Sequence, residues 1–121
     1  MAENINWNFV IQALGGPSVS GAGTIEADAY DKLTITVPDG ESQVVNLAPN
    51  GDISLLVVNP AVPNADLSYE VDGDAVPLDG PHILIGAGAV GLLGDITSLE
   101  FTNNTGADAV IGILIGRDAT P

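Results

Sequence analysis

The chain has 121 residues and a formal net charge of −14, from sixteen Asp and Glu residues against two Lys and Arg residues. This length suits one domain, so residues 1–121 are expected to form a single domain. Two bases cannot form the basic cluster that binding to nucleic acid or to an anionic membrane surface requires, and the absence of cysteine excludes disulfides and thiolate metal sites.

The expected strands follow from the spacing of turn residues. Gly, Pro, Asn and Asp recur about every 8 to 12 residues, and short runs rich in β-branched residues lie between them, which is typical of a sandwich or barrel. We therefore expect an all-β fold, a single antiparallel β-sandwich that is jelly-roll-like and has about eight or nine strands. The predicted strands are residues 5–14, 24–29, 32–37, 43–47, 53–58, 67–71, 83–85, 96–102 and 109–115, and residues 69–78 fit a strand, a turn and a strand.

Individual strands differ in their expected burial. Residues 32–37 alternate between apolar and polar, which predicts a strand with one buried face. Residues 53–58 are apolar almost throughout, which predicts a central strand covered on both faces. Trp7 and Phe9 alternate on one face of the first strand, and we expect both in the core.

A glycine-rich segment follows the strand at residues 83–85. Gly86, Gly88 and Gly91 match the spacing of the dinucleotide-binding fingerprint, and Asp108 lies at about the distance of a ribose-binding acid. The fingerprint needs a helix and a parallel sheet, whereas Gly94 leaves room here for about one helical turn. The small residues would instead permit close approach of other backbone, either within the domain or between copies, and we favour the latter. The expected interface residues are Gly86, Gly88, Val90, Gly91, Leu92 and Leu93.

The other polar candidates point to structural roles. His82 is the one histidine and lacks an evident catalytic partner, so we expect a turn histidine bonded to backbone, with Asp79 close enough in sequence to pair with it. Asp72, Asp74 and Asp79 are weak calcium candidates, because they supply fewer oxygen ligands than calcium prefers. Arg117 is expected to pair with a carboxylate. Residues 103–105 match a glycosylation acceptor but are expected to form a turn. No catalytic residue and no cofactor are predicted.

The sequence also resembles a known group of proteins. The segments YDKLTITVPDGESQVVNL, PHILIGAGAVGLLG and ITSLEFTNNTGADAVIGILIGRDA are similar in their strand and turn pattern to small all-β virion proteins of tailed bacteriophages, of the decoration or accessory kind. The resemblance covers about residues 24–118. It implies a structural role, a trimer and a capsid or other virion protein as partner, and it transfers no catalytic residue.

Composition favours self-association. Hydrophobic residues make up 45% of the chain and the mean hydropathy is +0.33, more apolar surface than a small domain is expected to hide. We expect a non-enzymatic structural protein that forms homo-oligomers, strengthened by salt or divalent cations. The alternatives are a subunit of a filament or surface layer, and a small ligand- or carbohydrate-binding module. The start of the chain lacks the features of a signal peptide, and no apolar run reaches the roughly 18 residues of a membrane span, so we expect synthesis in the host cytoplasm and a place in the virion.

Overall fold

A computed structural model describes residues 3–27, 29–47, 52–71, 73–93 and 98–118. These residues form ten strands, one turn of α-helix and one 3-10 turn. The elements are β1 (Glu3–Gln12), β2 (Ser18–Ala27), β3 (Ala29–Val37), β4 (Ser42–Asn46), β5 (Asp52–Pro60), β6 (Asn64–Val71), β7 (Asp74–Leu78), β8 (His82–Ile85), α1 (Ala87–Val90), the 3-10 turn Gly91–Leu93, β9 (Ser98–Asn103) and β10 (Ala109–Asp118). The all-β prediction is confirmed.

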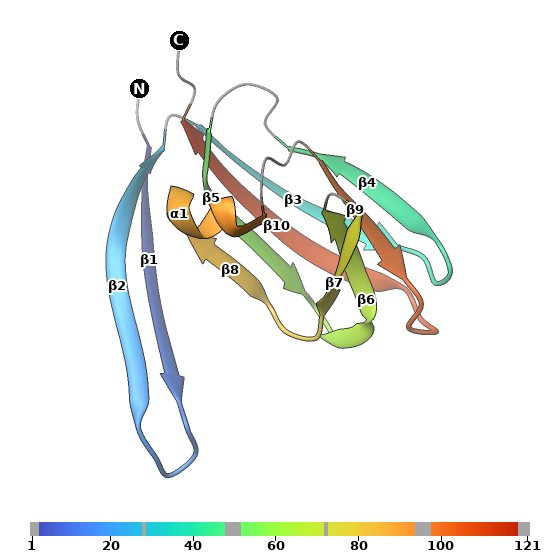
Figure 1. Cartoon of the computed structure of the whole chain (residues 1–121), viewed down its shortest axis with the longest axis horizontal. Helices are drawn as coiled ribbons and strands as arrows, with labels where there is room; N and C mark the ends of the chain where they lie inside the picture. Colours follow the sequence, from blue (N-terminus) through green and yellow to red (C-terminus); the bar gives the residue numbers. More distant parts are fainter. Residues whose placement is uncertain (1–2, 28, 48–51, 72, 94–97, 119–121) are drawn as a thin grey trace.

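The body of the molecule is a sandwich of two four-stranded sheets (Figure 1). Sheet 1 has the strand order β3-β10-β5-β8, and sheet 2 has the order β4-β9-β6-β7. Every strand pair among the described residues is antiparallel. From β3 to β10 the chain passes from one sheet to the other at each step except β6 to β7, which is the connectivity of a jelly roll.

The core lies between the two sheets and is mostly aliphatic. The alternation predicted for residues 32–37 places Ile35 and Val37 of β3 inside, and β10 contributes Ile111, Ile113 and Ile115. Strand β5 lies between β10 and β8, as its apolar run predicted, with Leu56 and Val58 on its inner face. Sheet 2 closes the core with inward side chains that include Leu67, Tyr69, Leu78, Leu99 and Phe101.

A buried asparagine joins three segments at one end of the sandwich. The Asn103 side chain is fully buried, and its Nδ2 donates hydrogen bonds to the carbonyl oxygens of Val37 and Ala107, at 2.9 and 2.7 Å. Its Oδ1 accepts hydrogen bonds from the backbone N–H and the hydroxyl of Thr105. The predicted turn is therefore present, and Asn103 links it to the end of β3.

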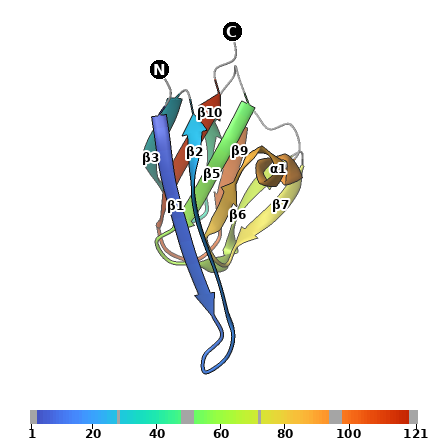
Figure 2. The same ribbon diagram turned by 90° about the vertical axis from the view of Figure 1, so that its left-hand side faces the viewer.

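Strands β1 and β2 form a separate two-stranded hairpin that runs beyond the sandwich (Figures 1 and 2). Strand β2 begins at Ser18, six residues before the predicted start of this strand. Trp7 and Phe9 lie on the hairpin and are partly exposed, so the prediction that they belong to the core is wrong. Alternation correctly predicts that Trp7 and Phe9 share one face of β1. In the structure their rings lie over the glycines of β2, and this face looks toward the outer surface of sheet 1.

Candidate functional site

The hairpin has one apolar face, which is built on paired aromatic residues and glycines. Trp7 lies opposite Gly23 in the register of the two strands, and Phe9 lies opposite Gly21. A Cβ atom at Gly23 would be 2.7 Å from the Trp7 ring, and one at Gly21 would be 2.8 Å from the Phe9 ring. The two rings lie nearly parallel, with centroids 6.1 Å apart. The glycines therefore leave the space that the rings need to lie flat across β2.

The base of the hairpin packs against the outer face of sheet 1. A Cβ atom at Gly116 of β10 would lie 3.2 Å from both Ile5 of β1 and Leu55 of β5, and 3.7 Å from Ala27 of β2. Leu55 and Ala27 are buried, although both lie outside the core between the sheets. Gly116 thus allows the hairpin to approach sheet 1 closely at this end.

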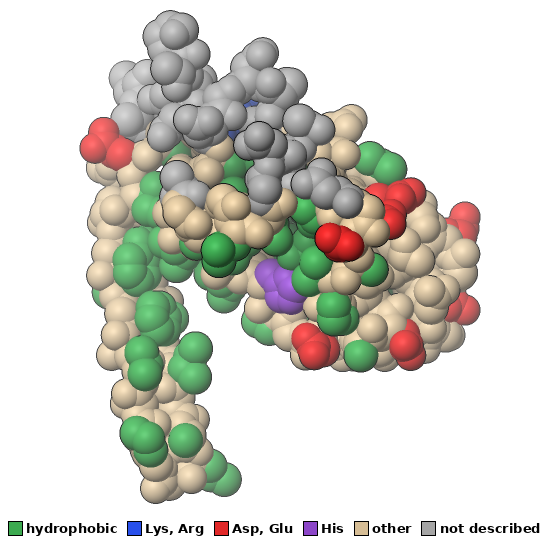
Figure 3. Space-filling view, viewed as in Figure 1, with side chains coloured by type: hydrophobic (Ala, Val, Ile, Leu, Met, Phe, Trp, Pro, Cys, Tyr) green, Lys and Arg blue, Asp and Glu red, His purple; other side chains and the backbone are tan. Residues whose placement is uncertain are grey.

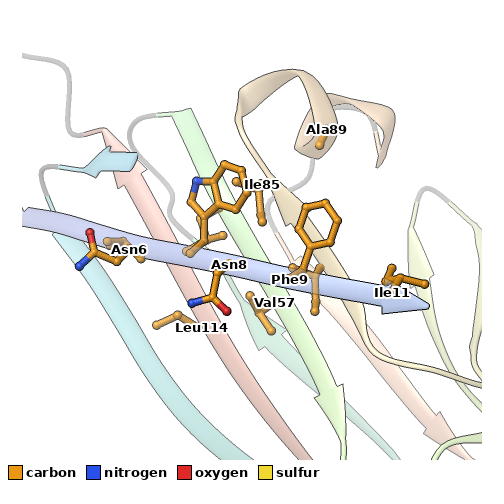
Figure 4. A pocket seen from close by; sticks show the side chains of 12 residues that line it. Asn6, Asn8, Phe9, Ile11, Val57, Ile85, Ala89 and Leu114 are labelled. Carbon is orange, nitrogen blue, oxygen red and sulfur yellow. The ribbon is translucent and has the colours of Figure 1, made fainter. Parts of the chain in front are cut away.

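Beyond this base, an apolar groove separates the hairpin from sheet 1. Its volume is about 620 Å³. Its hairpin wall consists of Ile5, Asn6, Trp7, Asn8, Phe9 and Ile11 of β1. Its other wall consists of Leu55, Val57, Ile83, Ile85 and Leu114 of sheet 1, with Ala89 of α1 at the rim (Figure 4). The groove contains no charged side chain among these residues, and Ile11 and Ile83 expose 69% and 53% of their surface.

The distal half of the hairpin, residues 9–21, is apolar and exposed. Val10, Ile11, Leu14 and Val19 all lie in it with most of their surface in solvent. Residues 4–25 contain no charged side chain, in a chain of net charge −14. Figure 3 shows hydrophobic side chains along the hairpin and acidic side chains over the body. Residues 4–25 of the hairpin and the lining of the groove therefore form an uncharged surface on an acidic protein.

The glycine-rich segment borders this groove and also closes one end of the core. Gly86 has a φ of 96°, and its N–H donates to the carbonyl of Ser54. Val90 is buried in the core of its own chain, and Leu93 packs partly against that core. Gly88, Gly91 and Leu92 are exposed. Of the predicted interface residues, Val90 and Leu93 are thus covered within the chain, whereas Leu92 remains open to solvent.

The same segment lacks the context of a dinucleotide site. It forms a single α-helical turn and a 3-10 turn, and the strands on either side of it belong to antiparallel pairs. A pyrophosphate site of the fingerprint type requires a longer helix that follows a strand of a parallel sheet.

His82 joins the two sheets through Tyr69. Its Nδ1 atom lies 2.7 Å from the Tyr69 hydroxyl, and the two rings meet edge to face. His82 begins β8 of sheet 1 and Tyr69 lies in β6 of sheet 2, so this hydrogen bond crosses the sandwich. The His82 side chain was expected to bond to backbone or to pair with Asp79, but its partner is the Tyr69 hydroxyl. Burial raises the pKa of the Tyr69 hydroxyl above its ordinary value.

The remaining polar predictions have mixed outcomes. Arg117 forms the expected ion pair, with Asp31 of the neighbouring strand β3. Of the calcium candidates, Asp74 begins β7 and Asp79 follows its last residue, and both are exposed, whereas Asp72 lies outside the described residues. Within the described part of the chain, no three His, Asp or Glu side chains are grouped closely enough to hold a metal ion. No helix of this part of the chain is long and apolar enough to cross a bilayer.

Sequence reasoning missed the groove. Two alternating patterns in the sequence could have indicated the hairpin wall of the groove. Aromatic residues alternate at Trp7 and Phe9, and glycines alternate at Gly21 and Gly23, which is the pattern of a hairpin whose rings lie across glycines. Comparisons of the chain with protein-family models, with curated proteins and with solved structures gave no significant match.

Proposed function

We propose that this chain is a non-enzymatic structural protein that self-associates through the hairpin and its groove, and that it serves as an accessory or decoration protein of a virion. The observation that carries the self-association is the exposed apolar half of the hairpin beside an open apolar groove. Contiguous exposed patches of this kind mark interaction sites.

The distribution of charge favours a second copy of this chain, and not a basic protein, as the partner of the hairpin and groove. Two molecules of net charge −14 repel, and the repulsion is smallest where neither molecule carries charged side chains. Residues 4–25 and the groove provide such a surface. A basic partner would instead be attracted to the acidic body.

The virion role comes from the resemblance in strand and turn pattern, and the fold is compatible with it. Jelly rolls are common in viral capsid domains, but they also occur in lectins and cupins, so the fold does not select among these roles. The trimer, the capsid partner and the location in a virion belong to this part of the proposal.

A filament or surface-layer subunit is the second candidate. In the described residues β1 and β2 pair only with each other, so each has an open edge, and neither strand contains the Pro or Lys residues that usually protect edges. A contact between a hairpin and a groove joins two different surfaces, which gives rings when it closes and filaments when it does not. Electron microscopy of the purified protein separates these two outcomes.

A charge placed on the hairpin tests self-association. Val19→Asp puts a carboxylate on the apolar face, and Val44→Asp is the matched control, because Val44 is similarly exposed but lies on β4 of sheet 2. We expect Val19→Asp to raise the dissociation constant of the assembly by about tenfold or more, which corresponds to at least about 1.4 kcal/mol. Sedimentation velocity measures both variants. Equal effects of the two substitutions would contradict a role for the hairpin.

If the protein is instead a ligand- or carbohydrate-binding module, the groove would hold a small molecule. Trp7 and Phe9 then provide parallel rings for stacking. A stable monomer whose Trp7 fluorescence changes on titration with a sugar would favour this alternative.

A further inference from the structure

The shape of the hairpin limits what can occupy the groove. Strands β1 and β2 have ten residues each, which corresponds to a ribbon of about 33 Å. Its base is held by Ile5 and Ala27 against Leu55 and Gly116, and its distal half extends past the sandwich (Figures 1 and 2). Beyond Ile11, the distal half is therefore left uncovered by the sandwich of its own chain.

This distal half has one apolar face, and its other face is mostly polar but carries Val10. Ile11 and Val19 form a cross-strand pair on the face that carries Trp7 and Phe9. Val10 belongs to the opposite face, where its neighbours along β1 are Asn8 and Gln12, and it is also exposed. A ribbon that enters the groove would cover the Ile11 and Val19 pair with one apolar wall and would place Val10 toward the other wall.

We infer that the distal half of the hairpin of one copy occupies the groove of a second copy, between that copy's own hairpin and its sheet 1. This rests on the self-association proposed above and specifies its geometry. A small apolar ligand would fill the groove but leave Val10, Leu14 and Val19 exposed, whereas a second hairpin covers the tip and the groove together. The charge-free run of residues 4–25 allows this contact without placing like charges opposite each other.

The absence of cysteine permits a direct test by disulfide crosslinking. Val19→Cys is made in one chain and Ile83→Cys in a second chain that carries a different tag. Neither chain can form a disulfide within itself, and both positions are exposed, so we expect the fold to tolerate each substitution. The matched control replaces Ile83→Cys by Val44→Cys, since Ile83 and Val44 expose 53% and 55% of their surface on opposite sheets. Leu14→Cys serves as a second tip position.

The inference predicts that mixing the Val19→Cys and Ile83→Cys chains under mild oxidation gives a mixed disulfide, at least about tenfold more abundant than with Val44→Cys, because docking raises the effective concentration of the two thiols. The Leu14→Cys chain should show the same preference. The mass of the unoxidised protein is measured in parallel. If the protein is an oligomer but crosslinks equally to both sheets, the hairpin does not dock in the groove, whereas self-association remains supported. A monomer at all concentrations overturns both.

Discussion

The Trp7 ring lies flat across Gly23, and no other residue type at position 23 would leave that space. Their Cα atoms are register partners in the hairpin, and a Cβ at Gly23 would approach the ring to 2.7 Å. Gly23 gives the Trp7 ring room on the face of β1 that lines the groove. The apolar groove depends on it, because Trp7 and Phe9 form much of the hairpin wall.

Gly23→Ala should therefore displace the Trp7 ring from β2. Trp7 is the one tryptophan of the chain, so we expect its fluorescence emission to move to longer wavelength as the ring becomes more exposed to water. The global free energy of unfolding should change by less than about 1 kcal/mol, because the hairpin packs outside the core. Gly80→Ala is the control, since a Cβ there meets no atom within 4 Å. An unchanged emission spectrum in Gly23→Ala would show that the ring does not depend on the glycine.

The strands of the sandwich were predictable because alternation and turn residues are local signals. The predicted strands at residues 32–37, 43–47 and 53–58 correspond to β3, β4 and β5 with small shifts at the ends. Residues 96 and 97 of the predicted strand 96–102 lie outside the described residues, and the remainder corresponds to β9. The order of the strands within the sheets depends on contacts between distant residues, and it required the structure.

The hairpin was harder to predict for a physical reason. Alternation shows which side chains of a strand share a face, but it does not show what that face covers. Alternation therefore predicts Trp7 and Phe9 in the core, whereas both lie on the hairpin. Residues 18–23 are mostly serine and glycine, which have low β-propensity, and they form the first part of β2 opposite the aromatic residues of β1.

Asn103→Ala should be strongly destabilising. It removes the four hydrogen bonds of the side chain and leaves the Val37 carbonyl without this donor, which together are expected to lower the free energy of unfolding by about 3 kcal/mol. The adjacent Asn104→Ala is the control, because that side chain is exposed, and its effect should stay within about 0.5 kcal/mol. Urea unfolding measures both variants. Similar losses in the two would contradict the role of Asn103 as the link between β3 and the turn before β10.

The glycines of the segment at residues 86–91 should respond differently to alanine. Gly86 has a φ of 96°, so Gly86→Ala is expected to cost about 1–3 kcal/mol of backbone strain. Gly88 lies in α1 without a positive φ and with open space around it, so Gly88→Ala should be neutral or stabilise by up to about 1 kcal/mol. Thermal unfolding of the two variants shows directly whether each substitution lowers or raises the stability of the fold. If both substitutions were harmless, the conformation of Gly86 would not be required by the fold.

Alkaline pH should weaken the fold through Tyr69. Its pKa is higher in the folded protein than in the unfolded chain because burial disfavours the phenolate. The stabilisation is therefore complete below the unfolded pKa of about 10, and it is lost as the pH rises from there through the folded pKa. Urea unfolding between about pH 8 and about pH 11 should show a steeper loss in the wild type than in Tyr69→Phe. Tyr30→Phe, at an exposed position, should keep the wild-type slope. A Tyr69→Phe slope equal to that of the wild type would contradict this assignment.

We propose that the uncharged apolar surface of the hairpin and groove joins copies of this chain. The most direct measurement is the molar mass in solution, by light scattering at micromolar protein over a range of salt concentrations. We predict a discrete multiple of the 12.2 kDa chain, with association strengthened as salt screens the repulsion between acidic bodies. A mass of 12.2 kDa at every salt concentration, or a mass that falls as salt rises, would contradict the account.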